Sequence, residues 1–300
     1  MYGTAVASGA GTVVNALATG RGAAFALDVS TRARVALDPT TTGVDGEIAD
    51  APTEDTTLIE RCVERVVDGY GDGEGGRVRT DGEVPLAAGL KSSSAAANAT
   101  VLATLAALDV AVGPDGSVSY ADACRIGVAA ARDAGVTVTG AFDDAAASML
   151  GGLVVTDNTA DELLTTAPFD YDAVVWTPPA RAYSADADVA ACEAVAPMAE
   201  LAIRLAREGS PTEAMTVNGL AFSAALEYPT DPAVAAMPHA AGVSLSGTGP
   251  SVVAVGEGDA LDPVAADWRE RPGEVVRTTT TAEGARIRDR GDGDPPNGWW

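Results

Sequence analysis

The feature that most constrains the fold is a short segment of glycine, lysine and serine between a strand pattern and a helix pattern. Residues 85–97 read P-L-A-A-G-L-K-S-S-S-A-A-A. Residues 77–84 alternate like a strand, and the alanine-rich residues 92–108 are typical of a helix. Free N–H groups at a helix N-terminus, its dipole, serine hydroxyls and one cation together favour a bound phosphate. The segment therefore predicts a strand, a phosphate-binding loop and a long helix in succession.

The alternative is an ordinary turn with a serine N-cap, which is commoner. Three observations favour the phosphate loop: a cap needs one serine and not three, apolar residues frame the loop, and Lys91 is the only lysine among 19 Lys and Arg residues. A position that keeps lysine where arginine is used elsewhere indicates a need for a compact ammonium group. The segment is not a Walker A loop, because Leu90 stands where that motif has glycine.

The charge balance excludes several partners. Asp and Glu number 43 against 19 Lys and Arg, which gives a formal net charge of −24. Such a chain lacks the positive field that binds nucleic acid or an anionic membrane surface. The acidic residues are spread through a chain that is 47% hydrophobic, so we expect a folded protein adapted to molar intracellular salt. With no signal peptide and no apolar run of membrane-spanning length, we expect a soluble cytoplasmic protein.

The histidine and cysteine residues do not favour a metal site or a disulfide framework. A single histidine, His239, excludes His-rich zinc sites, and we expect it to be structural. Cys62, Cys124 and Cys192 are odd in number and widely spaced, which disfavours disulfide or thiolate-metal frameworks.

The order of patterns predicts an α+β protein with two lobes. Strand patterns cover residues 4–8, 23–29, 32–37, 77–84, 153–156, 173–176, 243–245, 252–255 and 274–280; helix patterns cover 56–70, 92–108, 121–134, 187–207, 211–226 and 263–268. Residues 23–29 and 32–37 are expected to be separate strands joined by a tight turn. The polar residues 157–166 suggest a lobe boundary, with lobes at 1–157 and 158–288 and a disordered tail at 289–300.

Several segments, in order, resemble the motifs of one enzyme superfamily, the GHMP kinases of small molecules. Residues 85–95 resemble its second motif, and residues 246–251 (S-G-T-G-P-S) its third. Residues 140–145 (G-A-F-D-D-A), followed by Gly151 and Gly152, are similar to the segment with the catalytic aspartate. Lys91, where most members have glycine, and residues 9–25 resemble the archaeal shikimate kinases. The resemblance runs from about residue 3 to residue 285.

This resemblance implies a fold and a nucleotide site. The N-terminal lobe would be like ribosomal protein S5 domain 2, the C-terminal lobe would be ferredoxin-like, and ATP would lie between them. Ser93 would be a ligand of Mg²⁺, and Lys91 would act in catalysis. The residues expected to contact ATP are Pro85, Leu86, Ala87, Ala88, Gly89, Leu90, Lys91, Ser92, Ser93, Ser94, Ala95, Gly247, Thr248 and Gly249.

An adjacent acidic pair in an apolar stretch is the candidate catalytic group. Asp143 or Asp144 would activate or orient the accepting hydroxyl. Counting back from Gly151 favours Asp144, whereas matching the preceding Gly-Ala-Phe favours Asp143. The alternative is that one or both are surface carboxylates, which are common in this chain.

For the acceptor, the resemblance implies shikimate, a carboxylate with several hydroxyls. Asn15 and Arg21 are the expected substrate-binding residues, with Arg21 as the carboxylate partner; the alternative for Arg21 is a solvated loop residue. Homoserine kinase is the nearest rival activity, and a non-catalytic nucleotide-binding sensor is the alternative from another class. The sequence predicts no particular oligomeric state.

Overall fold

The computed structural model describes residues 1–84, 89–180, 187–292 and 295. The strands are β1 (Tyr2–Val14), β2 (Arg21–Asp38), β3 (Val44–Ile48), β4 (Gly75–Gly82), β5 (Leu153–Asp157), β6 (Glu162–Ala167), β7 (Asp172–Thr177), β8 (Gly242–Leu245), β9 (Val252–Gly256), β10 (Glu274–Thr279) and β11 (Arg286–Gly291). The helices are α1 (Thr57–Tyr70), α2 (Ser92–Ala107), α3 (Tyr120–Asp133), α4 (Phe142–Leu150), α5 (Val189–Glu193), α6 (Ala196–Arg207), α7 (Pro211–Ala225), α8 (Asp231–Ala236) and α9 (Asp262–Arg269), with short 3₁₀ turns at Ala16–Ala18 and Gly258–Leu261.

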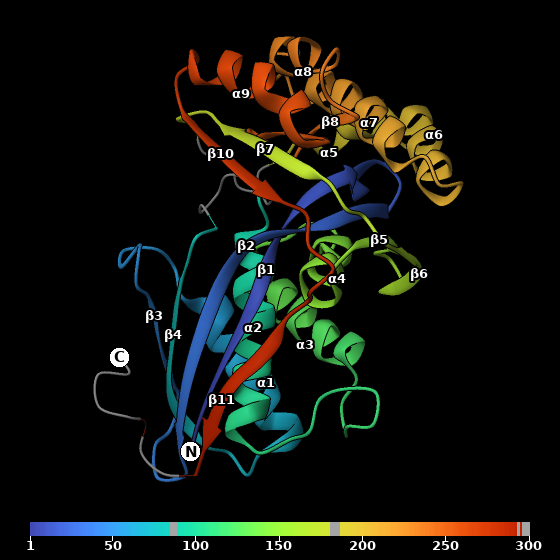
Figure 1. Ribbon diagram of the computed structural model, residues 1–300. Coiled ribbons are helices and arrows are strands. Elements are labelled where there is room, and N and C mark those ends of the chain that lie inside the picture. Colours follow the sequence, from blue (N-terminus) through green and yellow to red (C-terminus); the bar gives the residue numbers. More distant parts are fainter. Residues whose placement is uncertain (85–88, 181–186, 293–294, 296–300) are drawn as a thin grey trace.

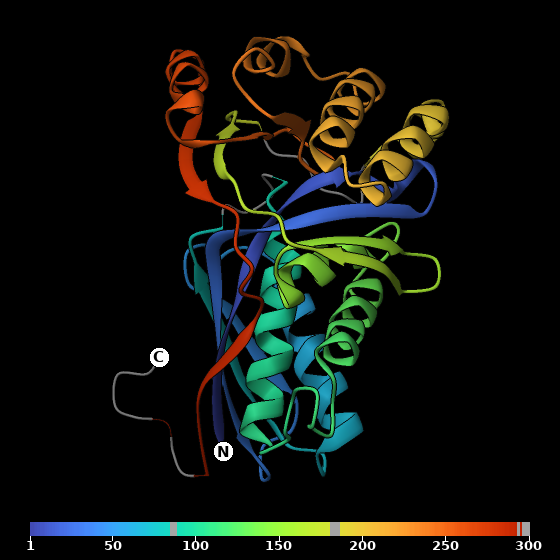
Figure 2. The same cartoon turned by 45° about the vertical axis from the view of Figure 1, so that its right-hand side comes forward.

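The first sheet runs through two very long strands. Its order is β11-β1-β2-β4-β3, and β5 pairs with β2 and β6 with β5; only β3 and β4 pair in parallel. Figures 1 and 2 show β1 and β2 rising from the base of the molecule until they pass beneath α6 and α7. The two strands therefore connect both lobes.

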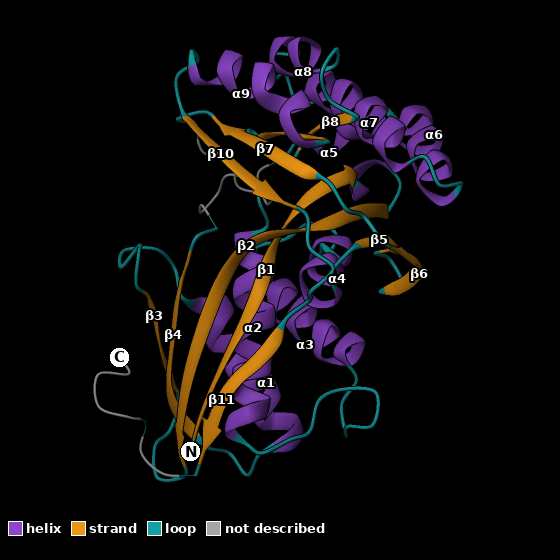
Figure 3. Cartoon of the chain, viewed as in Figure 1, coloured by secondary structure: helices purple, strands orange, loops and turns teal. Residues whose placement is uncertain are grey.

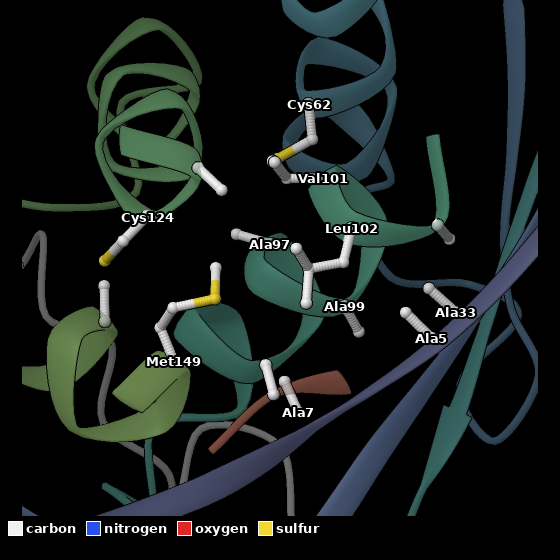
Figure 4. Close-up of a cluster of buried hydrophobic side chains, with 14 of the residues drawn as sticks. Ala5, Ala7, Ala33, Cys62, Ala97, Ala99, Val101, Leu102, Cys124 and Met149 are labelled. Carbon is white, nitrogen blue, oxygen red and sulfur yellow. The ribbon is translucent and has the colours of Figure 1, made fainter. Parts of the chain in front are cut away.

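Helices α1 to α4 cover one face of this sheet, with α2 at the centre (Figure 3). Alanine dominates α2, and twelve of its residues are buried against β1, β2 and the neighbouring helices. Small side chains let backbones approach closely: a Cβ on Gly3 would lie 2.1 Å from the carbonyl oxygen of Ala103. Figure 4 shows the resulting core, in which Ala5 and Ala33 of the strands lie beside Ala99 and Leu102 of α2, while Cys62, Cys124 and Met149 come from the surrounding helices. This packing fixes where α2 begins.

The second sheet has the order β10-β7-β9-β8, and its strands β7, β8 and β9 are largely buried. Val175, Val253 and Val255 face the upper parts of β1 and β2 together with α6 and α7. Val174, Val252 and Ala254 face the opposite way, toward α8, α9 and Trp268. Alternate residues of a strand point to opposite faces, so burial on both sides explains the continuous apolar runs in β7 and β9.

The predicted α+β fold with two lobes is confirmed, but its details differ. Residues 23–29 and 32–37 belong to one strand, β2, because Thr31 and Ser30 between them pair with Ala7 and Ser8 of β1. A bulge follows at residues 28–29, since Ser8 pairs with Ser30 and the next residue, Gly9, with Leu27. The predicted helix over 187–207 is two helices, α5 and α6.

Two strands lie near the predicted ends of the lobes. Strand β6 overlaps the polar stretch at 157–166 and pairs with β5 in the first sheet. Strand β11 returns to pair with β1, so residues 289–291 of the expected tail are part of that sheet. Within the described residues, no helix has both the length and the apolar character that a membrane crossing requires.

Candidate active site

The centre of the site is an ion pair between the starts of two helices. Lys91 directly precedes α2 and has a left-handed backbone with φ 65°. Its Nζ lies 2.9 Å from Oδ1 of Asp144, which stands in the first turn of α4. The two side chains are only 7% and 15% exposed. Because helix N-termini attract negative charge, the point where α2 and α4 converge suits phosphate.

A cavity of about 630 Å³ opens on one side of this pair. It is lined by Gly89, Lys91 and the three serines of the first turn of α2. Aliphatic residues, including Ile48, Leu58, Ile59, Val84 and Val128, also line it, as do several acidic residues. A cavity of this size, with phosphate-binding groups at α2 and aliphatic side chains in its wall, fits a nucleotide.

A second, much smaller cavity of about 40 Å³ opens on the other side. It is lined by Thr12, Asn15, Leu17, Asp143 and the loop of residues 137–141, among others. Lys91, Asp144, Gly247 and Thr248 line both cavities. The ion pair therefore stands at the boundary between a large and a small binding space.

The glycine loop at residues 246–249 is held to the first lobe through the backbone N–H and the carbonyl oxygen of Gly247. The N–H of Gly247 donates to Oγ1 of Thr12 at 2.8 Å, and Nδ2 of Asn15 donates to the carbonyl oxygen of Gly247 at 2.9 Å. Gly247 has φ +60°, and a Cβ there would lie 2.6 Å from the Lys91 Nζ. Ser246 also donates to the carbonyl oxygen of Gly89 at 2.7 Å. A side chain at position 247 would therefore displace the ammonium group of Lys91.

Asp143 is the more deeply buried member of the acidic pair, at 3% exposure. Burial, followed by the charge of Asp144, raises its pKa to about 7, while Lys91 and a hydrogen bond from Asn158 oppose the shift. Its Oδ2 points at Gly22, where a Cβ would lie 2.2 Å away. Near neutral pH the Asp143 carboxyl is therefore partly protonated, which reduces the negative charge of the pair.

Most of the predicted site residues come together, and some do not. Gly89, Lys91, Ser92, Ser93, Ser94, Asp143, Asp144, Asn15, Gly247 and Thr248 line one or both cavities. Leu90, Ala95 and Gly249 do not: Leu90 and Ala95 are buried in the cores, and Gly249 lies against the ring of Tyr228. Pro85, Leu86, Ala87 and Ala88 lie outside the described residues.

Arg21 lies outside both cavities. Its Nη2 is 2.5 Å from Oε1 of Glu200 on α6.

Among the described residues, no group of three or more His, Cys, Asp and Glu side chains is arranged to hold a metal ion. Residues 137–139, which line the small cavity, and Asn158, which binds Asp143, carry no sequence signal, since a threonine or an asparagine in a polar stretch also suits an ordinary turn.

Known proteins with similar sequences decide the family. A shikimate kinase of Halobacterium salinarum is 65% identical over 286 residues, which covers 95% of this chain and 99% of that protein. A shikimate kinase of Methanosarcina mazei is 44% identical over 288 residues, covering 95% and 96%. Residues 57–152 match the GHMP kinases N terminal domain. The chain belongs to the shikimate kinases of the GHMP superfamily.

Solved structures of GHMP kinases share the fold. A homoserine kinase from Cytophaga hutchinsonii aligns with TM-score 0.75 at 18% identity, covering 96% of this chain and 97% of that one. A mevalonate kinase from Methanococcus jannaschii aligns with TM-score 0.74 at 10% identity, covering 93% and 98%. At such identities the likeness concerns architecture alone. As a member of this kinase family, the chain acts with ATP on a small molecule, and the Halobacterium relative fits the expected adaptation to salt.

Proposed function

We propose that this chain transfers the γ-phosphoryl group of ATP to a hydroxyl of shikimate, with the large cavity holding ATP and the acceptor hydroxyl approaching from the side of the small cavity. The observation that carries the proposal is the Lys91–Asp144 pair at the boundary of the two cavities. A cation that faces the phosphates and a carboxylate that faces the acceptor are what phosphoryl transfer requires at that boundary.

On the nucleotide side, the first turn of α2 binds the phosphates. Its N–H groups, the serine hydroxyls and Lys91 together oppose the charge of the triphosphate. The exposed hydroxyl of Ser93 lines this end of the cavity and fits Mg²⁺, which prefers hard oxygen ligands and takes several of them from the nucleotide. When bound, Mg²⁺ supplies neutralisation of the phosphate charge.

On the acceptor side, Asp144 is the group that receives the proton. The acceptor oxygen forms a bond to the γ-phosphorus, the bond from that phosphorus to the bridging oxygen of ADP breaks, and the hydroxyl proton passes to the Asp144 carboxylate. Asp144 is supported in this role because it contacts Lys91 and lines both cavities, whereas Asp143 lines only the small one. The ammonium group of Lys91, 2.9 Å from Asp144, helps to align the reacting oxygens.

The test is an ADP-release assay with shikimate, homoserine and mevalonate offered separately, in about 2 M KCl to screen the acidic surface. We expect turnover with shikimate to exceed that with the other alcohols by about 10²-fold or more. Asp144→Asn should lower kcat on the order of 10²–10⁴-fold with ATP binding retained. A preference for homoserine would overturn the acceptor, and ATP binding without turnover of any alcohol would indicate a nucleotide sensor.

A further inference from the structure

Asn158, directly after β5, uses its side chain to contact the acidic pair from behind. It is 1% exposed. Its Oδ1 accepts hydrogen bonds from the backbone N–H of Asp143 at 3.1 Å and from the hydroxyl of Thr156 at 2.7 Å. Its Nδ2 donates to Oδ1 of Asp143 at 2.7 Å and to the hydroxyl of Thr139 at 3.4 Å. One amide group therefore binds both the backbone and the carboxyl of the same aspartate.

The backbone contact replaces a missing helix cap. Helix α4 begins at Phe142, and the residue before it, Ala141, has φ 50° and no side chain that can cap the helix. The first N–H groups of a helix have no partners within it and need an outside acceptor. Asn158 supplies that acceptor from another element, at the turn of α4 that carries Asp143 and Asp144.

The backbone of Asn158 is itself fixed on both sides. Its N–H donates to the carbonyl oxygen of Gly20 at 2.8 Å, and its carbonyl oxygen accepts from Nη2 of Arg132 at 3.3 Å. The same guanidinium binds both carboxylate oxygens of Asp161, at 2.6 and 2.7 Å. A bidentate pair of this kind is rigid, so the amide of Asn158 is held in one place.

We propose that Asn158 is a positioning residue for phosphoryl transfer, whose amide sets the first turn of α4 so that Asp144 meets Lys91 and the acceptor. This inference rests on the proposed function, in which Asp144 receives the proton. Asn158 lines neither cavity and so acts through Asp143 and the helix start. A small misplacement of a reacting group is known to reduce rates about 10²-fold.

The test compares Asn158→Asp with the exchanged pair D143N/N158D. The single variant keeps the acceptor for the helix but places a second carboxylate opposite Oδ1 of Asp143. We expect kcat to fall on the order of 10²-fold, with KM for ATP changed less than about threefold, because the fault lies outside the nucleotide cavity. The exchanged pair restores one donor and one acceptor between the two positions, and we expect it to recover kcat to within about tenfold of the parent.

Asn98→Ala is the matched control, because Asn98 is equally buried and donates to the carbonyl oxygen of Ala145 on the same helix at 2.8 Å. Asn158→Ala, which adds no buried charge, is measured beside it. We expect both to lower Tm, and only Asn158→Ala to lower kcat strongly.

Equal kcat losses in these two alanine variants would overturn the proposal, since Asn158 would then be merely structural. Failure of the exchanged pair to recover kcat would also overturn it, because the reaction would then require the carboxylate of Asp143 itself and not its hydrogen bond with residue 158. Failure of the proposed function itself would already be visible in the parent enzyme, as absent turnover of shikimate.

Discussion

Among single residues, Lys91 is the one whose side chain is most closely matched to the space around it. Its ammonium group is nearly enclosed, with Asp144 on one side and Gly247 so close on the other that a Cβ would lie 2.6 Å from Nζ. A guanidinium is larger and planar, and it presents its donors in a fixed fork. The structure therefore gives a steric reason for the one lysine that the composition retains.

We expect Lys91→Arg to lower kcat/KM for ATP on the order of 10²-fold although the charge is kept, because the fork cannot occupy this space and still meet Asp144. Steady-state kinetics in KCl measure the change. Arg269→Lys, the reverse exchange at an exposed residue of α9, serves as the control and should leave the kinetics unchanged. An arginine variant within a few-fold of the parent would refute this interpretation of the lysine.

Residues of unusual composition can be singled out from the sequence, whereas others need the geometry of the fold. Lys91 and the three serines were identifiable because one lysine in the chain stands inside a serine cluster. The choice between Asp143 and Asp144 needs the contact with Lys91, which no spacing reveals. Arg21 also shows what the sequence does not reveal: a cation between glycines suggested a binding residue, and α6, far along the chain, brings Glu200 to it.

At the scale of elements, the loop at residues 246–249 works as a tight connection between the lobes. Thr12 and Asn15 at the end of β1 hold the peptide groups of Gly247, and Ser246 holds Gly89 at the start of the phosphate loop. Asn15 was predicted to bind substrate. It lines the small cavity, but its Nδ2 donates to Gly247 and its Oδ1 accepts from the N–H of Leu17. We infer that its main contribution is to hold this loop.

We expect Gly247→Ala to reduce kcat/KM on the order of 10²-fold, because the added methyl group displaces Lys91 from Asp144. Gly209→Ala is the matched control: Gly209 also has positive φ, at +89°, but nothing lies within 4 Å of its Cβ position. Both variants should lose about 1–2 kcal/mol of unfolding free energy from the left-handed backbone. Denaturant melts and kinetics separate the two effects, and equal activities in the two variants would contradict the crowding of Lys91.

Many of the elements were predictable, but β3, β6, β11, α4 and α8 were not. The periodic patterns predicted α1, α2 and α3 well because each buries one face or is buried throughout. The polar residues within β2 looked like a turn, but they pair with β1 beside a bulge where the register changes. Strands β6 and β11 were missed because their residues are mainly polar or half exposed, and only pairing with β5 and β1 makes them strands.

For the whole molecule, a net charge of −24 repels anions, whereas the site has to bind them. Among the described residues, Lys91 is the only cation that lines either cavity. The large cavity is also lined by five acidic residues: Asp50, Glu54, Asp55, Asp81 and Glu83. Two anionic substrates must therefore enter a strongly negative surface. Molar salt shortens the Debye length to about 3 Å, which screens that repulsion and leaves the enclosed contacts of Lys91 in place.

We expect Tm to fall when KCl is lowered from about 2 M to about 0.1 M, because the Debye length then grows to about 10 Å and the surface carboxylates repel one another. KM for ATP should rise over the same range. A triple variant, D115N/E208Q/E257Q, neutralises three exposed carboxylates remote from the cavities and should lose less Tm on dilution of the salt than the parent does. Sucrose at matched osmolarity is the control. If sucrose protected the fold as well as KCl, or if the triple variant responded to salt like the parent, charge screening would not explain the acidic composition.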